Sequence, residues 1–120
     1  MDQKEFEKKF KKAKVDKRKK SPIPAVTKKV YDYTKYDTMF PEGFRMIIVA
    51  EEEFSEAIKE ASKFLRQKGD KMHLIEELAD ASICIEFLKT ACGISDNDLA
   101  KAIAVKTGEL ERRLNEGTWK

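Results

Sequence analysis

The segment LIEELADASICIEFL, residues 74–88, decides the fold of this chain. Its apolar residues recur at intervals of three and four, which is the spacing of a helical face. Asp70 can cap that helix and Gly93 can end it, so we expect a helix over about 71–92. Two apolar strips lie on opposite sides of it: Leu74, Leu78, Ala81, Ile85 and Leu88 form the first, and Ala79, Ile83 and Phe87 form the second. A helix that is apolar on two sides is normally covered on both.

The segments on either side have the same helical period. Residues 44–65 predict a long helix over about 45–68, which Gly69 is expected to end. Ser95 and Asp98 resemble a capping box, and they open a last helix that is expected to end near Gly117. The residues of this helix that we expect to face inward are Leu99, Ala102, Ile103, Leu110 and Leu114.

The first forty residues are less regular. Apolar residues at i, i+4 and i+7, from Phe6 to Ala13, predict a short helix over about 3–14. Residues 15–24, VDKRKKSPIP, are basic and contain two prolines, which is typical of a connector. Residues 24–37, PAVTKKVYDYTKYD, fit either a short helix or an extended stretch, and both interpretations stay open. Four rings are expected to pack in the interior rather than to stack on a nucleobase: Tyr31, Tyr33, Tyr36 and Trp119.

These elements predict an all-α protein. Connections of three or four residues favour antiparallel packing of neighbouring helices, as in a helical bundle. The chain has 120 residues, five of them glycine and three proline, which suits one helical domain better than a turn-rich fold. So small a bundle has little material to cover both sides of the helix at 71–92. We therefore expect oligomerisation, as a homodimer or homotetramer, to complete it.

The charge is distributed unevenly along the chain. Residues 1–40 hold thirteen Lys and Arg against six Asp and Glu, whereas residues 41–120 hold twelve against sixteen. We therefore divide the chain into a basic amino-terminal arm, 1–40, and a helical domain, 41–120. A basic arm on an acidic body can bind nucleic acid or supply cations around a phosphate-handling site, and composition does not choose between these.

The sequence also indicates the cellular compartment of the protein. No apolar run approaches the roughly 18 residues of a membrane span, and the amino terminus has no signal-peptide apolar region. Cys84 and Cys92 lie eight residues apart on a predicted helix, about 12 Å along its axis, and cannot form a disulfide with each other there. We expect a cytoplasmic protein without a membrane partner.

Two acidic clusters are the candidate metal-binding residues of the chain. They are Glu52, Glu53 and Glu56 on one predicted helix, and Glu76, Glu77 and Asp80 on the next. Carboxylates three residues apart share a flank of their helix, where like charges repel. The second cluster lies within the most apolar segment, with no Lys or Arg between Met72 and Phe87 to pair with it. Hard oxygen ligands on two antiparallel helices suit Mg²⁺, with Mn²⁺ as an alternative metal.

Glu53-x-x-Glu56, then twenty residues, then Glu77-x-x-Asp80 resembles the signature of the MazG-like, all-alpha nucleoside triphosphate pyrophosphohydrolases. The resemblance covers about residues 44–115. It implies that these four acidic residues hold Mg²⁺ and that residues 41–120 are a MazG-like catalytic domain. It further implies that water attacks the α-phosphate of a nucleoside triphosphate, giving the monophosphate and pyrophosphate.

The resemblance extends to individual roles. It implies Lys106 and Arg113 as phosphate-binding residues. One acidic residue is available as the general base, and we expect it to be Glu53 or Glu56. His73, the only histidine, is given no role because hard oxygen donors already fill the constellation. The alternative to an enzyme is a basic-armed nucleic-acid-binding module, or an inactive oligomerising helical module, on the same scaffold.

Overall fold

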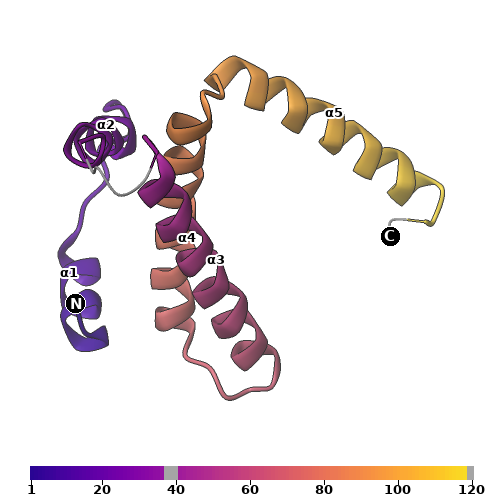
Figure 1. The fold of residues 1–120 in the computed structure, drawn as a ribbon. Helices are drawn as coiled ribbons and strands as arrows, with labels where there is room; N and C mark the ends of the chain where they lie inside the picture. The colour runs from indigo at the N-terminus through magenta and orange to yellow at the C-terminus, as the bar shows by residue number, and fades with distance from the viewer. Residues whose placement is uncertain (37–40, 119–120) are drawn as a thin grey trace.

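The computed structural model describes residues 1–36 and 41–118, and these residues form helices without strands. The helices are α1 (Gln3–Lys12), α2 (Ile23–Thr34), α3 (Phe44–Leu65), α4 (Lys71–Cys92) and α5 (Asp96–Asn115). The predicted all-α class is therefore confirmed over the described part of the chain (Figure 1). No helix in these two ranges is both long and apolar enough to span a membrane. Trp119 lies outside the described residues.

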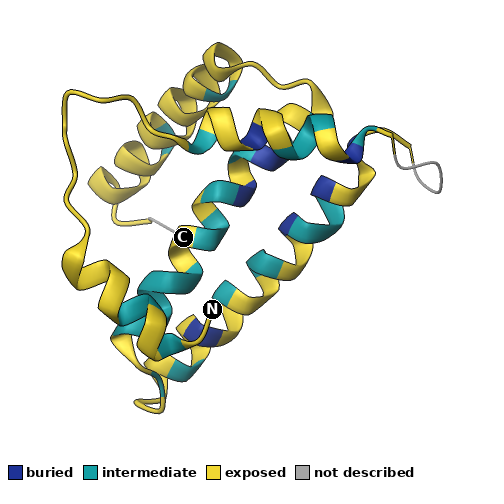
Figure 2. Ribbon diagram, turned by 90° about the vertical axis from the view of Figure 1, so that its left-hand side faces the viewer, coloured by how far each residue is buried: buried dark blue, intermediate teal, exposed yellow. Residues whose placement is uncertain are grey.

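The centre of the fold is the antiparallel hairpin of α3 and α4 (Figure 1). Its core consists of Met46 and Ala50 from α3 with Cys84 and Phe87 from α4. Figure 2 shows the buried and half-buried residues gathered on α2, α3 and α4, whereas α5 is exposed along most of its length. The core is small because it occupies only one part of the hairpin, next to α2.

The predicted bounds of α4 are confirmed. The Asp70 carboxylate accepts a hydrogen bond of 2.8 Å from the Met72 backbone N–H at its start. Gly93 follows its last residue with a φ of +67°, a left-handed conformation that glycine adopts without steric cost. Both signals are local in the sequence, which explains why the sequence predicts this helix accurately.

The end of α3 differs from the prediction. The helix stops at Leu65 because Gln67 takes a φ of +58°, with Gln67 N–H donating to Phe64 O at 3.0 Å and Lys68 N–H to Lys63 O at 2.9 Å. This is a Schellman turn with glutamine in the position that glycine usually occupies. Gly69 is needed for another reason, because a Cβ there would lie 2.8 Å from the Phe64 backbone nitrogen.

The segment whose sequence fits either a helix or an extended stretch forms a helix, α2. Pro22 and Pro24 lie at its start, where a proline costs no helical hydrogen bond, so the connector ends earlier than predicted. Tyr31 packs against the core and its hydroxyl donates to Glu42. The prediction that the other rings are interior is wrong for Tyr33 and Tyr36, which lie on the exposed side of this end of the chain.

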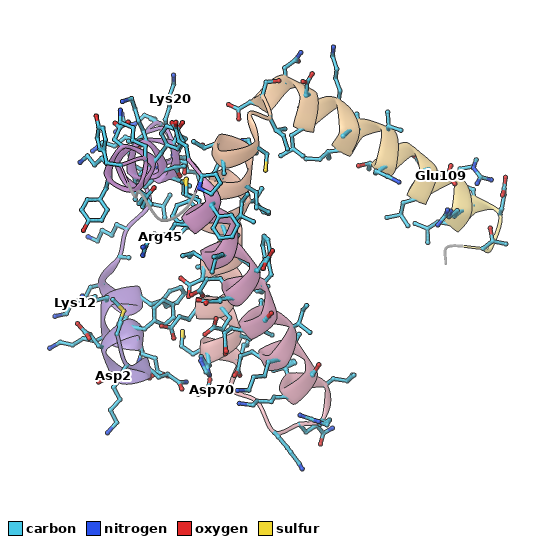
Figure 3. The ribbon with its side chains drawn as sticks, in the orientation of Figure 1. Asp2, Lys12, Lys20, Arg45, Asp70 and Glu109 are labelled. Carbon is cyan, nitrogen blue, oxygen red and sulfur yellow. The ribbon has the colours of Figure 1, made fainter. Side chains whose placement is uncertain are left out.

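The first helix covers one end of the hairpin. Helix α1 ends at Lys12, two residues before the predicted end, and the rings of Phe6 and Phe10 lie 5.9 Å apart on it. The Gln3 side-chain amide donates to the Asp70 carboxylate at the start of α4. Two residues that cap helices, Asp2 and Asp70, therefore lie at the same end of the molecule (Figure 3).

The last helix has the predicted bounds but not the predicted packing. The Asp98 N–H donates to the Ser95 hydroxyl at 3.1 Å, which confirms the cap. However, α5 leaves the end of α4 and points away from the hairpin (Figure 1), so the prediction that its apolar stripe faces inward is wrong for a single chain. Gly93 in a left-handed conformation and Ser95 in an extended one set this direction, which a short connection alone does not determine.

An apolar surface on the hairpin also stays uncovered. Leu78 and Ile85, which belong to the first predicted strip of α4, are exposed, as are Ile58 and Leu65 on α3. We call these four residues the open face. Helices α1 and α2 pack on α4, yet neither covers the open face.

The turn between α3 and α4 gives a first prediction. Replacing Gly69 by alanine drives a Cβ into rigid backbone, so we expect the free energy of unfolding in urea to fall by about 1–3 kcal/mol. Gly108→Ala is the matched control, because a Cβ at that helical position meets nothing within 4 Å and alanine favours a helix. Equal stability of the Gly69→Ala variant and the wild type would contradict this account of the turn.

Candidate metal centre

Three of the predicted metal ligands converge. Glu53 on α3 and Glu77 and Asp80 on α4 each offer a carboxylate oxygen, and these oxygens lie within 4.8 Å of one another. Glu77 and Asp80 share a flank of α4 because they are three residues apart. The antiparallel hairpin brings that flank opposite Glu53. We call these three residues the acidic triad.

The fourth predicted ligand lies nearby but outside the triad. Glu56 is exposed on α3, one turn beyond Glu53, and lines the same hollow of about 620 Å³. Glu76 lines this hollow as well. The remaining lining residues are apolar: Met1, Phe6, Ala79 and Ile83. The amino-terminal helix therefore contributes to the same hollow as the acidic residues of α3 and α4.

The triad lacks positive charge of its own. Burial, followed by repulsion from Asp80 and Glu77, raises the pKa of Glu53. Burial and Asp80 likewise raise the pKa of Glu77, while His73 opposes the shift. The Glu77 side chain is only 12% exposed, and its buried Oε2 has no hydrogen-bond partner in the described part of the chain. A cation at this position would stabilise the ionised carboxylates.

These donors fit a hard divalent cation. Three carboxylates and a buried oxygen without a partner match the ligand chemistry of Mg²⁺ or Mn²⁺. The nearby Cys84 does not add a soft ligand, because burial, Glu53 and Asp80 raise the pKa of its thiol to about 11. The thiol is therefore protonated at neutral pH.

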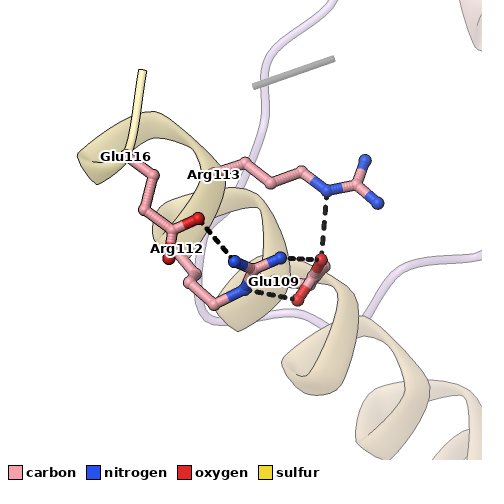
Figure 4. A network of polar contacts seen from close by, with 4 residues as sticks. All are labelled: Glu109, Arg112, Arg113 and Glu116. Carbon is pink, nitrogen blue, oxygen red and sulfur yellow. Dashed lines mark hydrogen bonds and ion pairs between the residues drawn. The ribbon is translucent and has the colours of Figure 1, made fainter. Parts of the chain in front are cut away.

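The two predicted phosphate-binding residues lie elsewhere. Lys106 and Arg113 are on α5, which points away from the triad, so a single chain does not bring them to the site (Figure 1). Lys106 lines a shallow hollow on α5 itself with Leu99 and Ile103. Arg113 Nε lies 3.0 Å from Glu109 Oε1, in a network that also holds Arg112 and Glu116 (Figure 4).

Behind the triad lies a pair of residues that the acidic motifs do not predict. His73 lies between two carboxylates, with Nε2 3.3 Å from Glu77 Oε1 and Nδ1 3.3 Å from Glu60 Oε2. Glu60 is one of the buried residues of α3. The available signal was spacing: His73 precedes Glu77 by four residues, and Glu60 follows Glu53 by seven, so each lies on the flank of its neighbour.

Comparison with known proteins identifies no protein that is similar to this chain. No protein-family model matches the chain, and searches of curated proteins and of solved structures found no match either. The likeness to the MazG-like family therefore stays a prediction from the acidic motifs.

The raised pKa of Glu53 gives a prediction for the metal-free protein. A carboxyl whose pKa is higher in the folded chain than its ordinary value of 4.5 destabilises the fold once it ionises. Glu53→Gln should therefore raise the melting temperature relative to wild type, with little gain at pH 4.5 and a growing gain as the pH rises through the raised pKa. Thermal denaturation in EDTA across this pH range measures the difference.

The matched control is Glu51→Gln, an exposed carboxylate on the same helix that does not line the hollow. Its effect should stay within about 0.5 kcal/mol at every pH. A gain for Glu53→Gln that is independent of pH, or no gain, would contradict the electrostatic account of the triad.

Proposed function

We propose that this chain is a Mg²⁺-dependent pyrophosphohydrolase of the MazG-like type, which cleaves an NTP or dNTP to the nucleoside monophosphate and pyrophosphate. The observation that supports this most is the acidic triad, in which carboxylates from two helices meet around a buried oxygen without a partner. A triphosphate carries several negative charges, so five acidic residues around one hollow would repel it unless cations lie between them.

The proposed reaction assigns roles to residues of this chain. Glu53, Glu77 and Asp80 hold the metal, which when bound neutralises phosphate charge and acidifies water. Glu56 is exposed beside them and is free to take the proton from the attacking water. The bond from the water oxygen to the α-phosphorus forms, and the bond from the α-phosphorus to the α,β-bridging oxygen breaks. Pyrophosphate leaves with that oxygen.

The walls of the hollow suit the two ends of such a substrate. The acidic wall, with its metal, would receive the phosphates. Met1 at the start of the chain and Phe6 on α1, with Ile83 from α4, form the apolar part of the hollow, which would receive the less polar nucleoside. The hollow of about 620 Å³ is large enough for a small ligand of this class.

We also propose a homodimer. The open face and the apolar stripe of α5 are both uncovered in a single chain, and a second copy supplies both surfaces. A dimer would also explain how Lys106 and Arg113 reach a substrate. If these residues bind phosphate, α5 of one subunit must extend to the hollow of the other. A homotetramer would need a further interface.

A specific observation favours the alternative, a nucleic-acid-binding module. The connector between α1 and α2 is exposed throughout, and three of its lysines line a hollow of about 460 Å³. Lys14, Lys19 and Lys20 are the basic residues of that hollow, none of whose lining residues lines the acidic one, and Figure 3 shows Lys20 beside α2. The two candidate functions therefore use different surfaces.

The enzyme proposal is tested with a panel of nucleoside triphosphates and Mg²⁺, scored for pyrophosphate against orthophosphate. We expect pyrophosphate release that EDTA abolishes. Asp80→Asn should reduce it by about 100-fold or more, because a metal ligand is lost, whereas Glu51→Gln should not. Orthophosphate as the primary product would contradict the proposed cleavage position. No turnover, together with salt-sensitive binding of DNA or RNA through residues 17–20, would favour the alternative.

The dimer proposal is tested by substituting the open face. Leu78→Lys places a charge in the proposed interface, so we expect light scattering after size exclusion to show the mass of one chain instead of two. Val15→Lys, at an exposed apolar residue of the connector, should keep the wild-type mass. A wild-type protein that stays monomeric at high concentration would contradict the proposal.

A further inference from the structure

We propose that His73, anchored by the buried carboxylate of Glu60, is a positioning residue that fixes the Glu77 carboxylate for metal binding. This inference rests on the proposed function, because it assigns Glu77 to a metal. It goes beyond that function because it adds an outer layer of two residues that neither the acidic motifs nor the proposed reaction includes.

The anchor is Glu60. Its side chain is only 4% exposed, and both of its oxygens have partners. Lys63 Nζ lies 3.2 Å from Oε1, and His73 Nδ1 lies 3.3 Å from Oε2. A buried carboxylate with two basic neighbours is held in one place, so it can fix the orientation of the imidazole ring that it contacts.

The imidazole ring of His73 connects the fixed Glu60 carboxylate to the triad residue Glu77. His73 Nε2 lies 3.3 Å from Glu77 Oε1, on the other side of the ring from Glu60. Either protonation state of the ring leaves at least one N–H between the two carboxylates. Both ring nitrogens face carboxylates of the protein, so His73 is not placed as a metal ligand.

The two oxygens of Glu77 therefore have different roles. Oε1 contacts His73, whereas Oε2 is buried and has no hydrogen-bond partner among residues 1–36 and 41–118. A carboxylate that contacts a fixed ring through one oxygen has fewer orientations open to it before a cation arrives. The ordering cost of metal binding is then smaller, which is how residues behind a metal site strengthen it.

Two amide substitutions separate positioning from simple packing. In His73→Gln the side-chain amide reaches the place of Nε2 and can still donate to Glu77. In His73→Asn the shorter amide lies near the place of Nδ1 and faces Glu60 instead. Both variants keep a polar side chain at this helical position, so they differ chiefly in which carboxylate they contact.

The experiment is a Mn²⁺ titration of the metal-free full chain, followed by the electron paramagnetic resonance signal of free Mn²⁺. We expect His73→Asn to weaken binding by about tenfold and His73→Gln to keep most of the wild-type affinity. Glu60→Gln should weaken binding as well, whereas Glu51→Gln should not. The melting temperature of each metal-free variant is measured in parallel, to report any purely structural effect.

The outcomes distinguish this inference from the proposed function. Saturable Mn²⁺ binding in the wild type that His73→Asn leaves unchanged, or that both amides weaken equally, would overturn the positioning role alone. No saturable binding in the wild type would overturn the metal site and this inference together. Loss of affinity in His73→Asn with rescue in His73→Gln, at similar melting temperatures, would support it.

Discussion

Repulsion among three partly buried carboxylates is the constraint on which the account of this site depends. Glu53, Glu77 and Asp80 meet at the interface of the two helices that hold the whole fold together. The apolar core lies toward the α2 end of the same interface, with Met46 and Phe87 among its residues. The hairpin thus packs well at one end and concentrates negative charge farther along, an arrangement that a bound cation would stabilise.

The α3–α4 hairpin carries both the acidic triad and the open face proposed as a dimer interface. Helix α4 faces α3 with its acidic residues and Cys84, faces the amino-terminal helices with a second side, and leaves Leu78 and Ile85 uncovered on a third. Helix α5, which could have covered this surface, points away instead. In the proposed dimer, the surfaces that a single chain leaves open and the basic residues that its site lacks would come from the second copy.

Local signals account for what the sequence predicts well. Asp70, Gly93 and Ser95 act on adjacent backbone groups, so the bounds of α4 and the start of α5 follow from the sequence. The convergence of the triad follows from helical spacing on an antiparallel pair. Other features depend on backbone angles and tertiary contacts, which residue patterns do not encode. They are the direction of α5, the end of α3 that the backbone of Gln67 sets, and the bridge from Glu60 through His73.

A crystal structure of the protein grown with Mn²⁺, with anomalous scattering recorded near the manganese absorption edge, is the most direct test of the central claim. The account predicts an anomalous peak within bonding distance of carboxylate oxygens from Glu53, Glu77 and Asp80. A well-ordered hairpin whose three carboxylates point apart into solvent, with no peak between them, would contradict it.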